Sequence, residues 1–280
     1  MQRQGGIDLP PWDSPWEPIL DYDINAAFFR HYGPWHIIHI GSRITPDRMT
    51  TLLGFATDAS VLVVADRAGS KKGGGIVDAD QLKIACANER CAIASNGSLA
   101  FTNQILARLF DVEKWLPGPE ELGTFNIERR IRDNHPHSLD QSTPNWIVEA
   151  IASLREGFRR LAEKRPKETQ EKNPFEAGFL VGGLFDADEH SGAGPRVAVI
   201  DKDHTKPAFY WPGDVALNSP GATDELRQRA PSLLSGQECS LDEALRTIFS
   251  ECARCAPDKC SARYIWTLIP DEGMEIHEPN

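Results

Sequence analysis

A threonine and an aspartate early in the patterned part of the chain could together perform nucleophilic chemistry. Thr50 precedes two short apolar runs, Thr51 to Phe55 and Val61 to Ala65, which a polar turn joins, and Asp66 follows the second run directly. This pattern predicts a β-hairpin with a carboxylate where its second strand stops. A threonine hydroxyl is a poor nucleophile unless a neighbouring group takes its proton. A hydroxyl and a carboxylate near the same end of a hairpin therefore mark a candidate site.

Composition and charge limit the class of protein. The chain has 280 residues, of which 40% are hydrophobic and 25% charged, and a mass of 31.1 kDa. These values are typical of a globular protein, and the length favours one large domain with extensions. The formal charge of −11 argues against nucleic acid as a partner, because phosphate binding requires clustered lysine and arginine.

The sequence favours a cytoplasmic location. No apolar run reaches the roughly 18 residues that span a bilayer, and the first thirty residues lack the basic-then-apolar order of a secretory signal. Six cysteines are too few for a disulfide scaffold and fit free thiols in a reducing compartment. Neither a membrane nor a disulfide framework is therefore expected.

Residues 1–49 differ from the rest of the chain and are interpreted as an N-terminal extension or propeptide. Leu9 to Pro18 is too rich in proline for a helix, and only Trp35 to Ile40 has the pattern of a strand. The tryptophans and prolines are compatible with a partner-binding arm or with a surface-packing segment, and the second is favoured. Residues 50–280 form the predicted domain.

Changes of period along the domain predict its elements. Val61 to Ala65 is apolar at every position, as expected for a strand covered on both faces. Residues 117–145 have no strong period and are interpreted as a long helix–helix connection with one basic turn around 127–131, and residues 167–172 as a charged linker. Ser240 and Glu243 form a capping-box pattern. The order of elements predicts an α+β arrangement of two sheets between helix layers. The remaining elements are strands at Gly75–Ile84, Cys91–Ser95, Gly178–Phe185, Arg196–Asp201, Pro207–Trp211, Val215–Asn218 and Arg263–Ile269, and helices at Phe101–Leu116, Ile147–Leu161, Asp224–Arg229 and Ser240–Cys252.

Several of these residues stand at intervals that resemble the proteasome β-subunit family, which includes the bacterial HslV-type peptidases and belongs to the N-terminal-nucleophile hydrolases. Asp66 follows Thr50 by 16 residues, and Gly97 follows Lys83 by 14, both as in that family. Lys83 comes one residue later than usual, an insertion that a glycine-rich loop before it can absorb. The other matches are the glycine pair Gly182 and Gly183 and the D-x-x-S pair Asp258 and Ser261. The resemblance covers roughly residues 50–269.

The chain departs from the family pattern at the residue before the nucleophile and in one loop. Met49 stands where self-processing members have glycine, and Asn218-Ser219-Pro220 stands where Gly-Ser-Gly is usual. Two routes to a free Thr50 are open. The leader is cut at the Met49–Thr50 bond, or Met49 is the true initiator and is removed, as in HslV-type members. If neither happens, the site stays latent.

The resemblance implies a four-layer αββα sandwich, the N-terminal-nucleophile hydrolase fold, with two antiparallel sheets between helix layers. As the first residue, Thr50 would use its own amine, with an unperturbed pKa of about 8, as the base for its hydroxyl. The Lys83 ammonium would lower the pKa of that hydroxyl, Asp66 would be its counter-ion, and the Gly97 N–H would stabilise the oxyanion. Residues that would orient the amine and relay protons through water are Ser219, Asp258 and Ser261.

Three further residues occupy the family's positions for the pocket that binds the side chain before the scissile bond. They are Ser95, Leu99 and Asn103, and their small or neutral character implies uncharged or apolar side chains at that position of the substrate.

The resemblance implies a threonine-type endopeptidase subunit that hydrolyses peptide bonds in polypeptides. It also implies a homo- or hetero-oligomeric ring, with an ATP-dependent unfoldase as an optional partner and with no cofactor or metal. One alternative is a catalytically silent, proteasome-like structural or regulatory subunit that keeps its extension. Another is a non-proteasomal amidase of the same fold.

Two other motifs carry less weight. The segment from Gly69 to Gly75 has the composition of a phosphate-binding loop but lacks the required Gly-Lys-Ser/Thr ending. Cys252, Cys255 and Cys260 could bind zinc, but no fourth ligand stands at a finger-like distance, and core or free cysteines are favoured.

Overall fold

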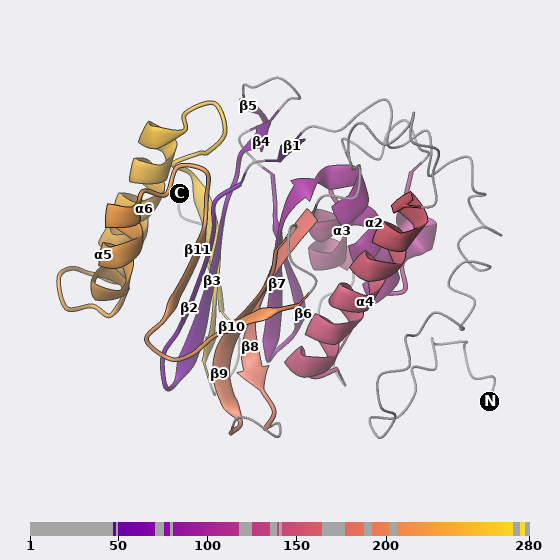
Figure 1. Cartoon of the computed structure of the whole chain (residues 1–280), viewed down its shortest axis with the longest axis horizontal. Helices are drawn as coiled ribbons and strands as arrows, with labels where there is room; N and C mark the ends of the chain where they lie inside the picture. The colour runs from indigo at the N-terminus through magenta and orange to yellow at the C-terminus, as the bar shows by residue number, and fades with distance from the viewer. Residues whose placement is uncertain are drawn as a thin grey trace.

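The described part of the chain is a mixed α+β structure with two antiparallel sheets packed face to face (Figure 1). The computed structural model describes residues 47–48, 50–70, 76–78, 81–117, 125–134, 139, 142–163, 177–187, 192–201, 206–270 and 275–277. The predicted strand at 35–40, the linker at 167–172 and almost all of the predicted extension lie outside these residues. The division into an extension and a domain therefore stays a prediction.

The first sheet is built around β7 and β8, and two short strands share the outer edge of β7. β6 pairs with the first half of β7, and β1 pairs with its end, with Arg48 opposite Gly97 and Asp47 opposite Ser98. The order β1-β7-β8-β9-β10, with β6 beside β7, is antiparallel throughout. The strands are β1 (Asp47–Arg48), β6 (Ile84–Asn88), β7 (Cys91–Ser98), β8 (Ala177–Phe185), β9 (Gly194–Ile200) and β10 (Ala208–Tyr210).

The predicted hairpin forms the centre of the second sheet. β2 and β3 pair in antiparallel register with Leu52 opposite Ala65, so residue 51 and Asp66 meet at the open end of the hairpin. This confirms the hairpin prediction. The sheet order is β11-β2-β3-β12-β13, and its strands are β2 (Leu52–Ala56), β3 (Ser60–Asp66), β11 (Val215–Asn218), β12 (Tyr264–Pro270) and β13 (Glu275–His277). A separate pair joins β4 (Gly69–Ser70) to β5 (Ile76–Asp78).

Helices lie on the outer face of each sheet (Figure 1). On the first sheet they are α2 (Leu99–Leu109), α3 (Ile127–Asn134) and α4 (Pro144–Glu163), and on the second α5 (Asp224–Leu234) and α6 (Leu241–Cys255). The prediction that β3 is covered on both faces is confirmed. Val61 and Val63 pack between the sheets, whereas Leu62 and Val64 pack against the helices of the second sheet. None of the described helices is long and apolar enough to cross a membrane.

The two sheets approach most closely at a glycine of β8. A Cβ built on Gly182 would lie 2.3 Å from Val63 Cγ2 of the opposite sheet, closer than real carbon contacts allow. A Cβ on the next residue, Gly183, would lie 2.8 Å from Pro144 Cγ at the start of α4. The glycine pair therefore lets β8 contact a sheet on one face and a helix on the other.

Several predicted elements differ in extent from the observed ones. The helix predicted to reach Leu116 ends at Leu109 because Asp111 adopts a φ of +54°. The N–H groups of Asp111 and Val112 then bond to the carbonyls of residues 108 and 107, a Schellman ending without glycine. A short 3-10 helix, η2 (Glu113–Trp115), follows. The strand predicted at 75–84 is wrong in extent, because β5 ends at Asp78 and β6 begins only at Ile84.

The basic turn predicted inside the 117–145 connection is a complete helix. α3 has buried Ile127 and Ile131 one turn apart on the face toward the first sheet. Two apolar residues among several charged ones are too short a pattern to predict a full helix from the sequence. Ser240 caps α6 in the predicted capping box with Glu243. α4 is confirmed and begins earlier than predicted, and α5 continues through Pro231 beyond its predicted end at Arg229.

Candidate active site

A buried lysine joins the two sheets at the end of the hairpin. Lys83 Nζ lies 2.6 Å from Asp66 Oδ1 and donates a hydrogen bond to Thr50 Oγ1 at 2.7 Å. All three side chains are at most 1% exposed. Thr50 precedes β2 and Asp66 ends β3 in the second sheet, whereas Lys83 directly precedes β6 in the first. The predicted trio is therefore brought together, although no regular element contains more than one of its members.

The Asp66 carboxylate is held by groups from three parts of the chain. Oδ1 accepts the ammonium of Lys83, and Oδ2 accepts the backbone N–H of Thr51 at 3.3 Å and that of Ser261 at 3.2 Å. Using both oxygens sets the orientation of the carboxylate and gives the buried charge several donors. Asp66 thus holds the lysine and also joins the start of β2 to the segment before β12.

The hydroxyl geometry fits a nucleophile beside a cation. Because the Lys83 ammonium donates to Thr50 Oγ1, it would stabilise negative charge that develops on that oxygen. Burial strengthens this effect, since little water screens the pair. The remaining requirement is a base that accepts the hydroxyl proton. In the 280-residue chain the nitrogen of Thr50 belongs to the peptide bond with Met49, which lies outside the described residues.

A second polar cluster forms behind the trio and uses the neighbouring threonine. Thr51 Oγ1 lies 2.8 Å from Ser219 Oγ, which also accepts the N–H of Gly221 and lies 3.6 Å from Cys260 Sγ. Burial raises the pKa of the Cys252 thiol, whereas its hydrogen bonds with Ser219 and Thr51 act in the opposite direction. Ser219 thus reaches the site as predicted, but the threonine hydroxyl that it contacts in the described chain is that of Thr51.

The loop that carries Ser219 is held by an arginine that sequence reasoning missed. Arg227, on α5, donates to the carbonyl of Leu217 and, at 3.4 Å, to the carbonyl of Ser219. An arginine in the first turns of a surface helix has no sequence feature that distinguishes it from a solvated charge. Thr51 could have been found, because two successive threonines before a strand place one side chain on each face.

Gly97 lies near the end of β7, between β1 and β8. Its φ of +90° is a conformation that residues with a side chain rarely adopt, so glycine is required there. The neighbouring Asn96 side chain accepts the N–H of Gly178 at 2.9 Å and fixes the pairing of β7 with β8. The oxyanion role of Gly97 stays a prediction, and its backbone is paired with Arg48 of β1 in this chain.

The predicted role of Asp258 stays a prediction. Asp258 is exposed in the turn after α6, and in the described residues no hydrogen bond or ion pair joins its carboxylate to the trio. Ser261 contacts the Asp66 carboxylate through its backbone N–H, whereas its hydroxyl accepts the N–H of Arg263 at 3.0 Å. A D-x-x-S spacing does not determine which side chains turn inward when both lie in a tight turn.

The predicted pocket residues are buried and already contact the helix layer. Ser95 Oγ donates to Glu128 Oε1 at 2.9 Å, and Asn103 holds the start of α3 through Phe125 O and the N–H of Ile127. Leu99, at the start of α2, is 1% exposed. These three residues therefore lie in one region between β7, α2 and α3, as their predicted role requires, but the region is closed in this chain.

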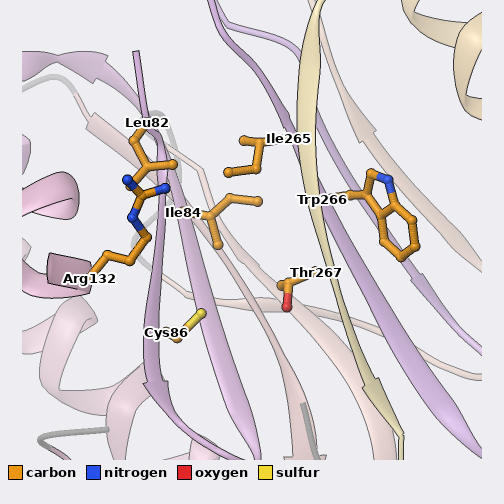
Figure 2. Close-up of a pocket in the computed structure, with 7 residues that line it drawn as sticks. All are labelled: Leu82, Ile84, Cys86, Arg132, Ile265, Trp266 and Thr267. Atoms are coloured by element: carbon orange, nitrogen blue, oxygen red, sulfur yellow. The ribbon is translucent and has the colours of Figure 1, made fainter. Parts of the chain in front are cut away.

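A small cavity lies between the sheets beside the site, and it is lined by residues on either side of Lys83. Figure 2 shows Ile84 and Ile265 pointing toward each other across it, with Arg132 and Cys86 on the side of the first sheet. Its volume is about 10 Å³, which is room for one water molecule at most. Burial raises the pKa of the Cys86 thiol to about 12, against the opposing charge of Arg132. The cavity is too small to hold a substrate.

The cysteine motif does not converge on one point. Cys252 and Cys260 are buried near Ser219, whereas Cys255 is exposed at the end of α6. Among the residues that the structure describes, no group of three or more histidine, cysteine, aspartate or glutamate side chains could hold a metal ion.

The sequence matches no protein-family model, and no curated protein matches it either. The function of the chain therefore has to be argued from the geometry of the site.

Proposed function

We propose that the chain is a threonine-type endopeptidase subunit of the proteasome β-subunit kind, with Thr50 as its nucleophile. The observation that carries this proposal is the buried Lys83 ammonium, which bridges Thr50 Oγ1 and Asp66 Oδ1 at 2.7 and 2.6 Å. A buried ion pair is weak evidence for stability alone, because desolvation offsets most of its attraction. A threonine hydroxyl placed on that ammonium is the expected arrangement for activating an N-terminal nucleophile.

The arrangement of layers supports the same proposal. Two antiparallel sheets between helix layers are compatible with the αββα sandwich of N-terminal-nucleophile hydrolases. The candidate nucleophile stands just before β2, where the central hairpin of the second sheet begins. Ring assembly and an unfoldase partner remain parts of the proposal that rest on the resemblance. The cytoplasmic location is a further part of the proposal and rests on the sequence pattern alone.

In the proposed reaction the free amine of Thr50 takes the hydroxyl proton while Oγ1 bonds to the carbonyl carbon of the scissile peptide. Lys83 stabilises the charge on Oγ1, and the Gly97 N–H stabilises the oxyanion. When the C–N bond breaks, the leaving amine takes the proton from the Thr50 ammonium, and an ester remains on Oγ1. Water then gives a proton to the amine and attacks the ester. The carboxylic acid leaves, and Oγ1 recovers its proton.

Intact-mass spectrometry of the purified full-length protein tests the first requirement. A species that begins at Thr50 and cleaves fluorogenic peptides is expected, and Thr50→Ala should abolish cleavage while Thr50→Ser retains part of it. Expression from Met49 as the initiator gives the same nucleophile by methionine removal. If neither form begins at Thr50 and cleaves peptides, the endopeptidase proposal is wrong.

The pairing of β1 favours a second candidate, a silent subunit that keeps its extension. Arg48 lies opposite Gly97, so in the uncut chain β1 runs along the edge of β7 at the residue that the oxyanion role needs. A stable protein with an intact Met49–Thr50 bond, no cleavage and a ring-sized particle in light scattering would support this candidate. Hydrolysis of small amides without cleavage of peptides would instead support an amidase, and a monomer would argue against either proteasome-like role.

A further inference from the structure

Thr51 has no part in the reaction described above, although a free Thr50 would be attached to the protein through it. Thr51 is 0% exposed. Its N–H donates to Asp66 Oδ2 at 3.3 Å, its carbonyl accepts the N–H of Asp66 at 3.0 Å, and its hydroxyl lies 2.8 Å from Ser219 Oγ. None of these three bonds uses a residue before Thr50, so cutting the Met49–Thr50 bond removes none of them.

The two threonines face opposite sides of the second sheet. Leu52 packs between the sheets and Leu53 packs against the helix layer of α5 and α6, and side chains alternate along an extended chain. Thr50 accordingly points to the inner face, where Lys83 donates to its hydroxyl, and Thr51 points toward the helix layer. The nucleophile is therefore held by an ammonium on one face of the sheet and, through its neighbour, by a hydroxyl on the other.

The loop that supplies this second hydroxyl is fastened to both helices of the layer. Arg227 of α5 donates to the carbonyls of Leu217 and Ser219. The Ser219 hydroxyl accepts the N–H of Gly221 at 3.2 Å. A Cβ built on Gly221 would overlap the carbonyl oxygen of Cys252, so the loop lies directly on α6. The position of the Ser219 hydroxyl is therefore set by the fold.

We propose that Thr51 is a positioning residue, whose hydroxyl, held by Ser219, keeps the free amine and Oγ1 of Thr50 in reacting geometry on Lys83. This inference rests on the proposed endopeptidase function and adds a residue to its site. After the cut, the only covalent attachment of Thr50 is its peptide bond to Thr51, so a rotation of residue 51 moves the nucleophile directly. A displacement of about 1 Å at a reacting group lowers the rate by about 100-fold.

The test uses two variants that separate the hydroxyl of Thr51 from its shape. Valine keeps the shape and loses the hydroxyl, whereas serine keeps the hydroxyl and loses the methyl group. In full-length protein matured to Thr50, as intact mass shows, Thr51→Val should lower kcat for a fluorogenic peptide by about 10- to 100-fold. KM should stay nearly unchanged, because residue 51 is buried. Thr51→Ser should keep most of the parent kcat.

A second threonine–serine pair on the same hairpin provides the matched control. Thr57 Oγ1 lies 2.9 Å from Ser60 Oγ in the turn between β2 and β3, at the end remote from the site. Thr57→Val removes a bond of the same kind and should change neither kcat nor KM. Urea unfolding of each variant checks that it is folded under the assay conditions, so that a lower kcat does not come from unfolded protein.

The outcomes separate this proposal from the proposed function. A parent-like kcat in Thr51→Val, or equal losses in Thr51→Val and Thr51→Ser, overturns the positioning role of the hydroxyl. An equal loss in Thr57→Val overturns it as well. In each case cleavage that disappears in Thr50→Ala leaves the endopeptidase proposal standing. No Thr50-dependent cleavage of any peptide by protein that begins at Thr50 overturns both proposals.

A second variant decides the question if Thr51→Val does not fold or does not mature. Lysine is a point charge without the planar fork of arginine, so Arg227→Lys should hold the two loop carbonyls less well. A lower kcat at the parent KM supports the proposal, and an unchanged kcat overturns it. Arg229→Lys is the control on the same helix, because Arg229 is exposed and pairs with Glu238 at the surface.

Discussion

The Lys83–Asp66 pair allows the sharpest test of the site through stability. Both side chains are 0% exposed, and Nζ and Oδ1 lie 2.6 Å apart. Methionine has a length similar to that of lysine but carries no charge. Lys83→Met therefore removes the only ion pair that Asp66 Oδ1 forms within the described residues. Breaking one side of such a pair costs about 3–5 kcal/mol of unfolding free energy, because the other charge stays buried without it. For a chain of this size that loss lowers Tm by about 10 °C.

The complementary change isolates the cause. Asp66→Asn keeps an oxygen that can accept the N–H groups of Thr51 and Ser261 but turns an amide toward Lys83, so a similar loss is expected. The double variant Lys83→Met with Asp66→Asn has no buried charge at the site. It should recover to within about 2 kcal/mol of the parent, because replacing both members of a buried pair is often nearly neutral. None of the three variants should cleave peptides.

Urea unfolding followed by tryptophan fluorescence, with Tm from calorimetry, measures all four proteins. A loss below about 1 kcal/mol for Lys83→Met would mean that the ammonium is solvated, as a surface lysine is. A double variant as unstable as the sum of the two single variants would mean that Lys83 and Asp66 contribute to stability independently, with no coupling between their charges. Either result would refute the reasoning that Lys83 is buried at a net cost for the sake of Thr50.

Three further measurements probe the fold around the site. Gly182→Ala should lower the unfolding free energy by about 1–3 kcal/mol, because its Cβ would meet the opposite sheet. Gly157→Ala, in an open position of α4, is the control and should raise the unfolding free energy by about 0.5–1 kcal/mol in the same urea experiment. Equal losses in the two variants would contradict the close approach of the sheets. Alkylation at pH 8, detected by mass spectrometry, should modify the exposed Cys255 in the native protein. Cys91 should react only after unfolding, since it is buried and burial raises the pKa of its thiol. Labelling of Cys91 in the native protein would count against its burial. Hydrogen bonds and charges from two arginines of α4 lower the pKa of Glu156 to about 2, so its contribution is complete above the unfolded value of about 4.5 and disappears as the pH falls through 2. This surface cluster is worth about 1 kcal/mol or less, and Glu156→Gln should remove that part of the acid dependence of stability.

The local elements of this protein were determined by its sequence. The hairpin of β2 and β3, the long helix α4 and the capping box at Ser240 were predicted correctly, because each depends on residues close together in the chain. Periodicity reports which side of one element meets the core, and a cap is satisfied within a single turn. The spacing of Thr50, Asp66 and Lys83 also indicated a candidate site before any contact was known.

Only the tertiary structure decided which polar side chains turn inward. Lys83 has the pattern of a solvated charge in a short strand, yet the packing of two sheets buries it against Asp66. The bond between Thr51 and Ser219 joins residues 168 positions apart, and Asp258, at a matching spacing, stays exposed. Glu128 comes beside Ser95 only because α3 packs on β6 and β7. Such contacts depend on strand register and on the distance between layers, which no local pattern contains, because they arise from the cooperative packing of segments far apart in the chain.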